Sequence, residues 1–167
     1  TRCSAPADIS NAPGSIYEAM TLINALPKPL TISCFIESLA HPLKIQASTS
    51  QLSTQPAIDP RSPRVFIYFG NLTMTVLASD NSNTTIELGE RSGFGMAVRG
   101  EVAFPVLGIL PTSSPYTTIL NGAGTRCAFC HNSETAVNND ATHTQAYASA
   151  VINIPGGTDV SIPTIVQ

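Results

Sequence analysis

Charged residues are what this sequence lacks most. Asp, Glu, Lys and Arg make up 11% of the 167 residues, whereas a typical soluble domain has about 25%. The formal net charge is −3 and no basic patch is present, so nucleic acid is not an expected partner. Such low charge is typical of extracellular β-rich proteins and also of subunits whose surface is covered by neighbours. The composition fits both.

Long apolar runs and catalytic motifs are also missing. No stretch approaches the roughly 20 apolar residues of a membrane span, so we expect no transmembrane segment. No signal peptide is recognisable at Thr1, which fits a mature chain from which one has been removed. The sequence contains no Ser-His-Asp order, phosphate loop or HExxH motif, so we expect a protein that is not an enzyme.

The chain has four cysteines, of which Cys127 and Cys130 form a local motif. Cys3 and Cys34 remain, and we expect a disulfide between them. A disulfide implies an oxidising compartment, so we expect a periplasmic or extracellular location. The alternatives are a buried free thiol at Cys34 with Cys3 unpaired, or a lipidated Cys3.

Hydrophobic patterning predicts one N-terminal helix followed by short strands. Residues 14–26 carry an apolar stripe with helical spacing, with Ser15 as a possible cap and Pro27 as the end. Alternating segments predict strands at 30–36, 43–49, 64–69, 72–78, 83–88, 96–104 and, more weakly, 116–120. Polar and glycine-containing pairs predict hairpin turns at 70–71 and 80–83. We therefore expect a mainly β fold, an antiparallel β-sandwich or open barrel.

The pattern changes beyond residue 121. The sequence Cys127-Ala128-Phe129-Cys130-His131 is the C-x-x-C-H signature of c-type haem attachment. Two thiols at this spacing on a helical turn can reach the two vinyl groups on one edge of a porphyrin, and the adjacent imidazole can bind the iron. Cys127 and Cys130 would form thioethers, and His131 would be the proximal ligand.

On these five residues and the glycine-rich approach at 122–124, the chain resembles the c-type cytochromes. The resemblance implies one covalent haem c and electron transfer, but it does not extend to the fold. Small cytochromes c are helical and have a distal methionine downstream of the motif, whereas this chain has no Met after Met96. Residues 34–39, 61–64 and 124–127 also resemble uncharacterised exported bacterial proteins, which brings no function.

The expected distal iron ligand is His143. A short helix is predicted at 141–152, and it would place Tyr147 and Val151 on the same side as His143, over the haem. The other candidate ligands are His41, Met20, Met74 and Met96, of which the methionines lie in segments that are typical of a core. Residues 153–167 are expected to form an extended tail.

Other chemistry is conceivable at the motif. A redox dithiol would be expected in a βαβ context, which the pattern lacks. A zinc site could use all four cysteines, or Cys127 and Cys130 with two histidines, although structural zinc sites usually show two close ligand pairs. The two thiols could also form an ordinary disulfide.

We therefore expect a β-rich domain at 1–121 and a haem-binding segment with its tail at 122–167, packed as one unit. The expected function is a monohaem electron carrier that meets redox partner proteins. The alternative is a structural or interaction subunit of an exported assembly, in which the C-x-x-C pair forms a disulfide or zinc site. Both allow an oligomer or a multi-protein complex.

Overall fold

The computed structural model describes residues 3–51, 55–78, 84–137, 145–151 and 158–160. Its helices are α1 (Ile16–Ala25), α2 (Ile32–Ser38), α3 (Ser114–Thr118) and the 3₁₀-helix η1 (Arg126–Phe129). The strands are β1 (Lys44–Thr49), β2 (Arg64–Phe69), β3 (Leu72–Leu77), β4 (Thr85–Gly93), β5 (Met96–Ala103), β6 (Leu120–Asn121), β7 (Gly124–Thr125), β8 (Thr135–Val137), β9 (Ala146–Ala150) and β10 (Thr158–Val160).

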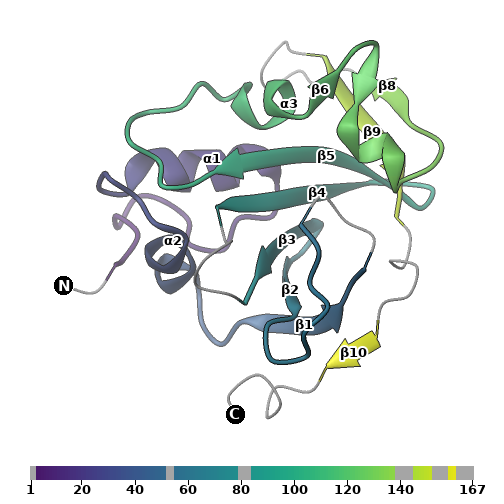
Figure 1. The fold of residues 1–167 in the computed structure, drawn as a ribbon. Coiled ribbons are helices and arrows are strands. Elements are labelled where there is room, and N and C mark those ends of the chain that lie inside the picture. Colours follow the sequence, from purple (N-terminus) through teal and green to yellow (C-terminus); the bar gives the residue numbers. More distant parts are fainter. Residues whose placement is uncertain (1–2, 52–54, 79–83, 138–144, 152–157, 161–167) are drawn as a thin grey trace.

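Eight of these strands form one antiparallel sheet in the order β10-β1-β2-β3-β4-β5-β9-β8, and β6 pairs with β7 separately. The central strands β2 to β5 follow one another in sequence, and the sheet is open and strongly twisted (Figure 1). The prediction of a mainly antiparallel β fold with an N-terminal helix is confirmed. The C-terminal part of the chain supplies strands at both edges, because β9 pairs with β5 and β10 pairs with β1.

Helix α1 forms where the apolar stripe predicts it. The Ser15 side chain accepts a hydrogen bond from the Glu18 N–H, as an N-cap does. The Ile16 N–H donates to the Glu90 carboxylate of β4 at 2.8 Å, so the helix N-terminus is held against the sheet. The helix ends at Ala25, and its C-cap Leu26 directly precedes Pro27. Both of its ends are therefore set by neighbouring residues in the sequence, and its orientation is set by β4.

Three predictions of local structure are wrong. The segment 30–36 was expected to be a strand, but α2 occupies most of it, capped by Thr31 and burying Ile32 and Phe35 at helical spacing. The weak strand at 116–120 is largely α3, with Pro115 in its first turn. The helix expected at 141–152 is β9 over residues 146–150, because these residues pair with β5. In each case packing against the sheet outweighs the local pattern.

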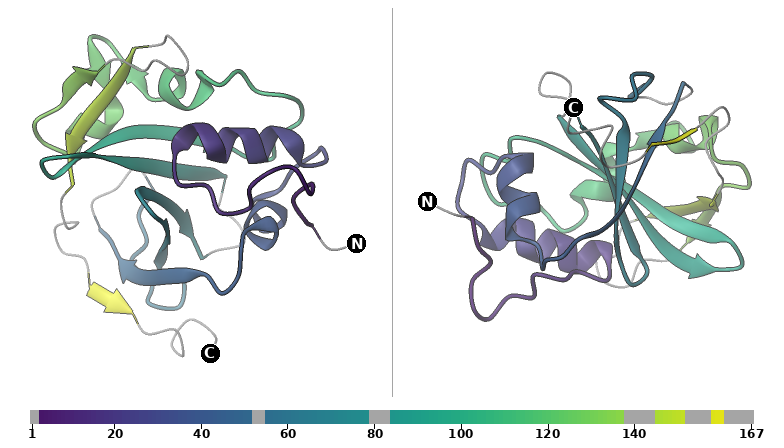
Figure 2. Two further views of the ribbon diagram at one scale, coloured as in Figure 1. Left: turned by 180° about the vertical axis from the view of Figure 1, so that it is seen from behind. Right: turned by 90° about the horizontal axis from the view of Figure 1, so that it is seen from below.

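The two faces of the sheet differ in chemistry. One face carries the apolar core and is covered by α1 and α2, which lie on the same side in both views of Figure 2. Side chains alternate along a strand, so the cross-strand register places Thr75, Glu87 and Glu101 together on the opposite face. Glu101 is buried there although it is charged. A polar interior of this kind needs paired charges.

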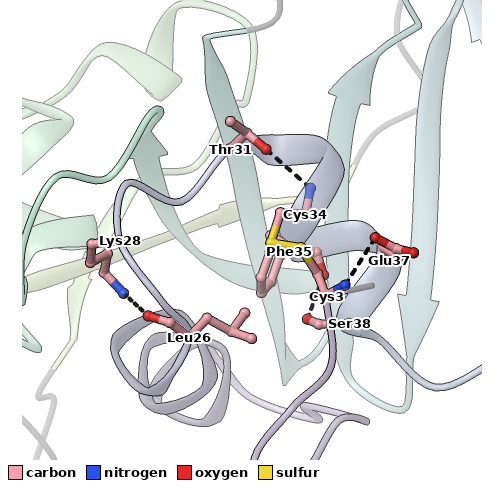
Figure 3. Close-up of a disulfide and its surroundings, with 8 residues drawn as sticks. All are labelled: Cys3, Leu26, Lys28, Thr31, Cys34, Phe35, Glu37 and Ser38. Carbon is pink, nitrogen blue, oxygen red and sulfur yellow. Dashed lines mark hydrogen bonds between the residues drawn. A yellow bond between two sulfur atoms is a disulfide. The ribbon is translucent and has the colours of Figure 1, made fainter. Parts of the chain in front are cut away.

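The predicted disulfide between Cys3 and Cys34 is present, with the two Cα atoms 5.3 Å apart. It attaches the N-terminal segment to α2 (Figure 3). The Cys3 N–H also donates to the Glu37 carboxylate at 3.1 Å, so covalent and hydrogen bonds hold the same segment. No helix in the described part of the chain is long and apolar enough to cross a membrane.

Candidate haem-attachment site

The motif lies on a helical turn next to the short β6–β7 hairpin. Thr125, the last residue of β7, caps η1 by accepting a hydrogen bond from the Cys127 N–H at 3.1 Å. The N–H groups of Cys130 and His131 both donate to the Cys127 carbonyl, at 3.1 and 2.9 Å. Residues 127–131 therefore form the turn that the C-x-x-C-H spacing requires. Both thiols are free and half-buried.

The approach to the motif is anchored by Glu134. Its carboxylate accepts a hydrogen bond from the Thr125 N–H at 2.9 Å and another from the Thr125 hydroxyl. The next residue, Arg126, forms an ion pair through its guanidinium with the buried Glu101 of β5. The two residues that precede Cys127 are thus fixed, Thr125 to the segment after the motif and Arg126 to the sheet.

The imidazole of His131 has one nitrogen turned toward the sheet. Its Nδ1 lies 3.0 Å from the Ala150 carbonyl oxygen at the end of β9. Arg99 of β5 reaches the same place, because its Nη2 lies 3.1 Å from the His131 Nδ1 and donates to the Ala150 carbonyl at 2.8 Å. In the tautomer whose Nδ1–H donates to Ala150, Nε2 is the ring nitrogen that can take an external ligand. A metal-binding histidine typically donates its other N–H to a backbone carbonyl in this way.

The surroundings keep this imidazole neutral. Burial lowers the pKa of His131, and the Arg99 charge lowers it further, while the hydrogen bond to Ala150 and the charge of Glu87 act in the opposite direction. A histidine must be neutral to bind a metal ion. His131 is therefore in the protonation state of an iron ligand at neutral pH.

The first cysteine of the motif is a poor nucleophile. Burial raises the pKa of the Cys127 thiol to about 11, and the carboxylates of Glu101 and Glu87 raise it as well. The hydrogen bond from Thr125 and the charge of Arg99 oppose this rise only in part. Reactive dithiols of the thioredoxin type depend on a lowered thiol pKa. The site thus lacks the electrostatics of a disulfide oxidoreductase.

Charged groups lie beneath the site on the polar face of the sheet. Arg64 is almost fully buried and pairs with Glu87 at 2.9 Å. Burial raises the pKa of Glu101, and the hydrogen bond and charge of Arg126 counteract this rise. Glu87 and Glu101 are cross-strand neighbours on this face, and each is paired with an arginine, Arg64 and Arg126 respectively.

Two aromatic side chains project into solvent near the motif. Phe129, inside the motif, is 90% exposed, and Phe94, in the β4–β5 turn, is fully exposed. Phe94 has a φ of 51°, a conformation that costs energy for a bulky residue and is concentrated at functional sites. The Val151 N–H donates to the Gly95 carbonyl at 2.7 Å, which brings this turn to the end of β9 where His131 is bound. Exposed apolar groups of this kind can cover the face of a porphyrin.

The structure separates the candidate distal ligands. His143 lies outside the described residues. Met20 and Met74 are buried in the core, and His41 is exposed ahead of β1. Met96, the first residue of β5, pairs with Ala150 at the end of β9, but alternation places its side chain on the face opposite Arg99.

One argument for His143 is corrected by the strand β9. In a helix, Tyr147 would share a face with His143, but Tyr147 lies in a strand and its hydroxyl donates to the Ala123 carbonyl at 3.0 Å. Tyr147 therefore links β9 to the approach of the motif. Val151, which is 49% exposed, follows the strand.

The zinc alternative loses part of its ligand set. Cys3 and Cys34 are bonded to each other, so they cannot join Cys127 and Cys130 at a metal ion. Among the residues that the structure describes, no group of three or more His, Cys, Asp or Glu side chains is placed to hold a metal. A haem differs from zinc here, because it needs only one or two protein ligands to its iron.

Sequence reasoning missed the residues that support the motif: Arg99, Thr125, Glu134 and Ala150. Thr125 directly precedes η1, and a Thr before a helical turn is a recognisable cap. Arg99 and Ala150 carry no local signal, because their role depends on the pairing of β5 with β9. The chain matches no protein-family model, no curated protein and no solved structure.

Proposed function

We propose that this chain holds one haem c, bound through Cys127, Cys130 and His131, and transfers electrons to and from redox partner proteins outside the cytoplasm. The observation that carries the proposal is the geometry of His131. Its backbone belongs to the same turn as both thiols, and its Nδ1 is directed at the Ala150 carbonyl. A bound haem would supply one-electron redox chemistry at its iron.

The residues of the site fit such a group in three respects. The two thiols are free and share one helical turn. Burial lowers the pKa of the imidazole, and an Nδ1–H that donates to Ala150 would leave Nε2 available. The exposed Phe94 and Phe129 offer apolar surface beside the motif. The protein's part is to hold the thiols and the imidazole in place and to limit the contact of water with the iron ligand.

The location outside the cytoplasm is supported by the Cys3–Cys34 disulfide, because disulfides persist mainly in oxidising compartments. The low fraction of charged residues, 11%, is in keeping with an exported protein or with a subunit of a larger assembly. We propose a periplasmic or extracellular location on these grounds.

The mass of the native chain tests this function. Protein expressed with an export signal and haem-attachment machinery should exceed the polypeptide mass by one haem, and the haem should stay with the polypeptide after extraction with acid and organic solvent. A C127A/C130A variant is the matched control and should carry no covalent haem. A native chain with the bare polypeptide mass, made by cells that attach haem to another c-type cytochrome, would overturn the proposal.

A second candidate function is a structural or interaction subunit of an exported assembly. It is favoured by the loop after β5, where Leu107 is 76% exposed and Ile109 is 82% exposed. Exposed apolar residues that lie close together can mark an interface with another protein. Size-exclusion chromatography coupled to light scattering would distinguish a lone carrier from an oligomer, and a monomer at high concentration would count against self-assembly.

A further inference from the structure

Arg99 places a charged group next to the expected iron ligand. It lies in β5, between β4 and β9 in the sheet. Its Nε donates to the Ser149 hydroxyl at 2.9 Å, and its Nη2 donates to the Ala150 carbonyl at 2.8 Å. These two bonds fix the guanidinium against β9. From this position Nη2 lies 3.1 Å from the Nδ1 of His131.

We infer that Arg99 is a positioning residue for His131, holding its Nδ1 toward the sheet and its Nε2 outward, and that its positive charge raises the reduction potential of a haem iron bound there. The inference rests on the proposed function, and it adds a tuning residue that the C-x-x-C-H motif does not contain.

The orienting role follows from the donors and acceptors present. A guanidinium carries only donors and stays charged. It can therefore lie close to an imidazole nitrogen only if that nitrogen accepts a hydrogen bond, or if both groups donate to the same acceptor. The Ala150 carbonyl is that shared acceptor, since both Arg99 and His131 lie within hydrogen-bond distance of its oxygen. Rotation of the ring to turn Nδ1 outward would lose this contact. Arg99, fixed by Ser149, keeps the acceptor in place.

The effect on potential follows from charge. Reduction of ferric to ferrous iron adds one electron and removes one positive charge from the site. A fixed cation beside the proximal imidazole disfavours the more positive ferric state, and it does so more strongly in a half-buried site than in water. The carboxylate of Glu87, in the neighbouring strand β4, attracts Arg99 and acts against this effect.

Three variants separate charge from geometry. R99Q removes the charge and the fork of donors, whereas R99K keeps the charge and loses the fork. R61Q is the matched control, because Arg61 is an exposed arginine whose guanidinium pairs with Asp59. For each haem-loaded protein the midpoint potential is measured by spectroelectrochemical titration. We expect a lower potential for R99Q, a value near wild type for R99K, and no change for R61Q.

A second measurement does not require haem. In the haem-free chain with both thiols intact, the ¹⁵N shifts of the His131 ring report its tautomer and its hydrogen bonds. We expect the wild-type and R61Q rings to show the shift of an Nδ1 that is hydrogen-bonded and shielded from water. The R99Q ring should show the shifts of a solvent-exposed imidazole. If R99Q does not fold, S149A takes its place. This variant removes only the partner of the Arg99 Nε, and it should weaken the hydrogen bonding of the His131 Nδ1.

The two measurements distinguish the possible failures. Unchanged His131 shifts in R99Q, or in S149A where R99Q does not fold, would overturn the positioning role whether or not haem is bound. A midpoint potential that is equal or higher in R99Q than in wild type would overturn the tuning role. A wild-type chain that never acquires haem refutes the proposed function and, with it, the tuning role, while the ring shifts still decide whether Arg99 orients His131.

Discussion

Glu134 binds Thr125 at two points, accepting hydrogen bonds from its backbone N–H and its hydroxyl. Thr125 in turn caps the turn that carries Cys127. A residue two positions before the motif and one three positions after it are therefore joined, and the C-x-x-C-H turn is enclosed in a small closed loop. This relationship keeps the turn in shape whether or not a cofactor is present.

Replacement of Glu134 should loosen this loop. E134A removes both acceptors, and we expect a loss of about 1–3 kcal/mol in the free energy of unfolding, because hydrogen bonds to a charged group are lost. E134Q keeps one acceptor oxygen and should lose less. Urea unfolding measures the difference. D8A, which alters an exposed carboxylate, serves as the control, and equal stability of E134A and D8A would contradict the role of Glu134.

Cys127 should react slowly in the native, haem-free chain. With a thiol pKa of about 11, only about one molecule in a thousand carries the thiolate at pH 8. The rate of alkylation by iodoacetamide should therefore rise about tenfold per pH unit up to roughly pH 11. In the denatured chain the rate should be higher at pH 8 and level off near pH 9, because the free thiol has a pKa of about 8.5.

Peptide mass spectrometry at timed intervals follows Cys127 separately from Cys130. The C130S variant gives the same measurement without the second thiol. Equal rates for Cys127 in native and denatured protein at pH 8 would show that burial does not raise its pKa.

The disulfide should contribute substantially to stability. It joins two cysteines separated by 31 residues, and closure of a loop of this size stabilises a fold by about 3–4 kcal/mol through the entropy of the unfolded chain. We expect the free energy of unfolding of C3S/C34S, measured by urea unfolding, to be lower than that of the wild type by this amount. Reductant should destabilise the wild type and leave the double variant unchanged. If reductant lowers the stability of both proteins equally, the effect comes from another source.

Gly100 should not tolerate a side chain. A Cβ atom at this position would lie 2.9 Å from the Cβ of Pro115 in α3, and overpacking of this kind costs about 1–3 kcal/mol. We expect G100A to be less stable in thermal unfolding. G108A is the matched control, since a Cβ there meets no atom within 4 Å. If G100A and G108A melt at the same temperature, α3 does not press on β5 as the structure shows.

His143 remains the predicted distal ligand. If it binds the iron, H143A should change the spectra from low spin to high spin, because the sixth position loses its strong-field ligand. H41A tests the other candidate histidine, which is exposed and far from the motif in sequence, and it should leave the spectrum unchanged if His143 is the ligand. An unchanged low-spin spectrum in H143A would exclude His143 and direct attention to the remaining candidates, His41 and Met96.

Much of the fold follows from local sequence. Helix α1 has its cap, its apolar stripe and its terminating proline within about a dozen residues, so it is recognisable without any partner. The β2–β3 hairpin is equally local, because Gly70 takes a φ of 56° in the two-residue turn between two strongly alternating runs. The C-x-x-C-H motif and the isolated Cys3 and Cys34 are also read directly from the chain.

The remaining features depend on contacts between distant residues. Residues 30–36 alternate like a strand, but residues 32–38 form α2 because Ile32 and Phe35 pack into a core that the other elements create. The small residues of β9 carry weak preferences, and their pairing with Met96, Ala97 and Val98 decides their conformation. Local propensity is too weak, by comparison with burial and cross-strand pairing, to settle such segments.

The candidate site shows the same division. The sequence by itself determined which residues could attach a haem, since the spacing of two thiols and an imidazole is a local property. The tertiary structure alone decided what holds the imidazole, because Arg99 and Ala150 reach His131 only after β9 has paired with β5. Hydrogen bonds act over about 3 Å, and sequence separation carries no information about which groups folding brings that close.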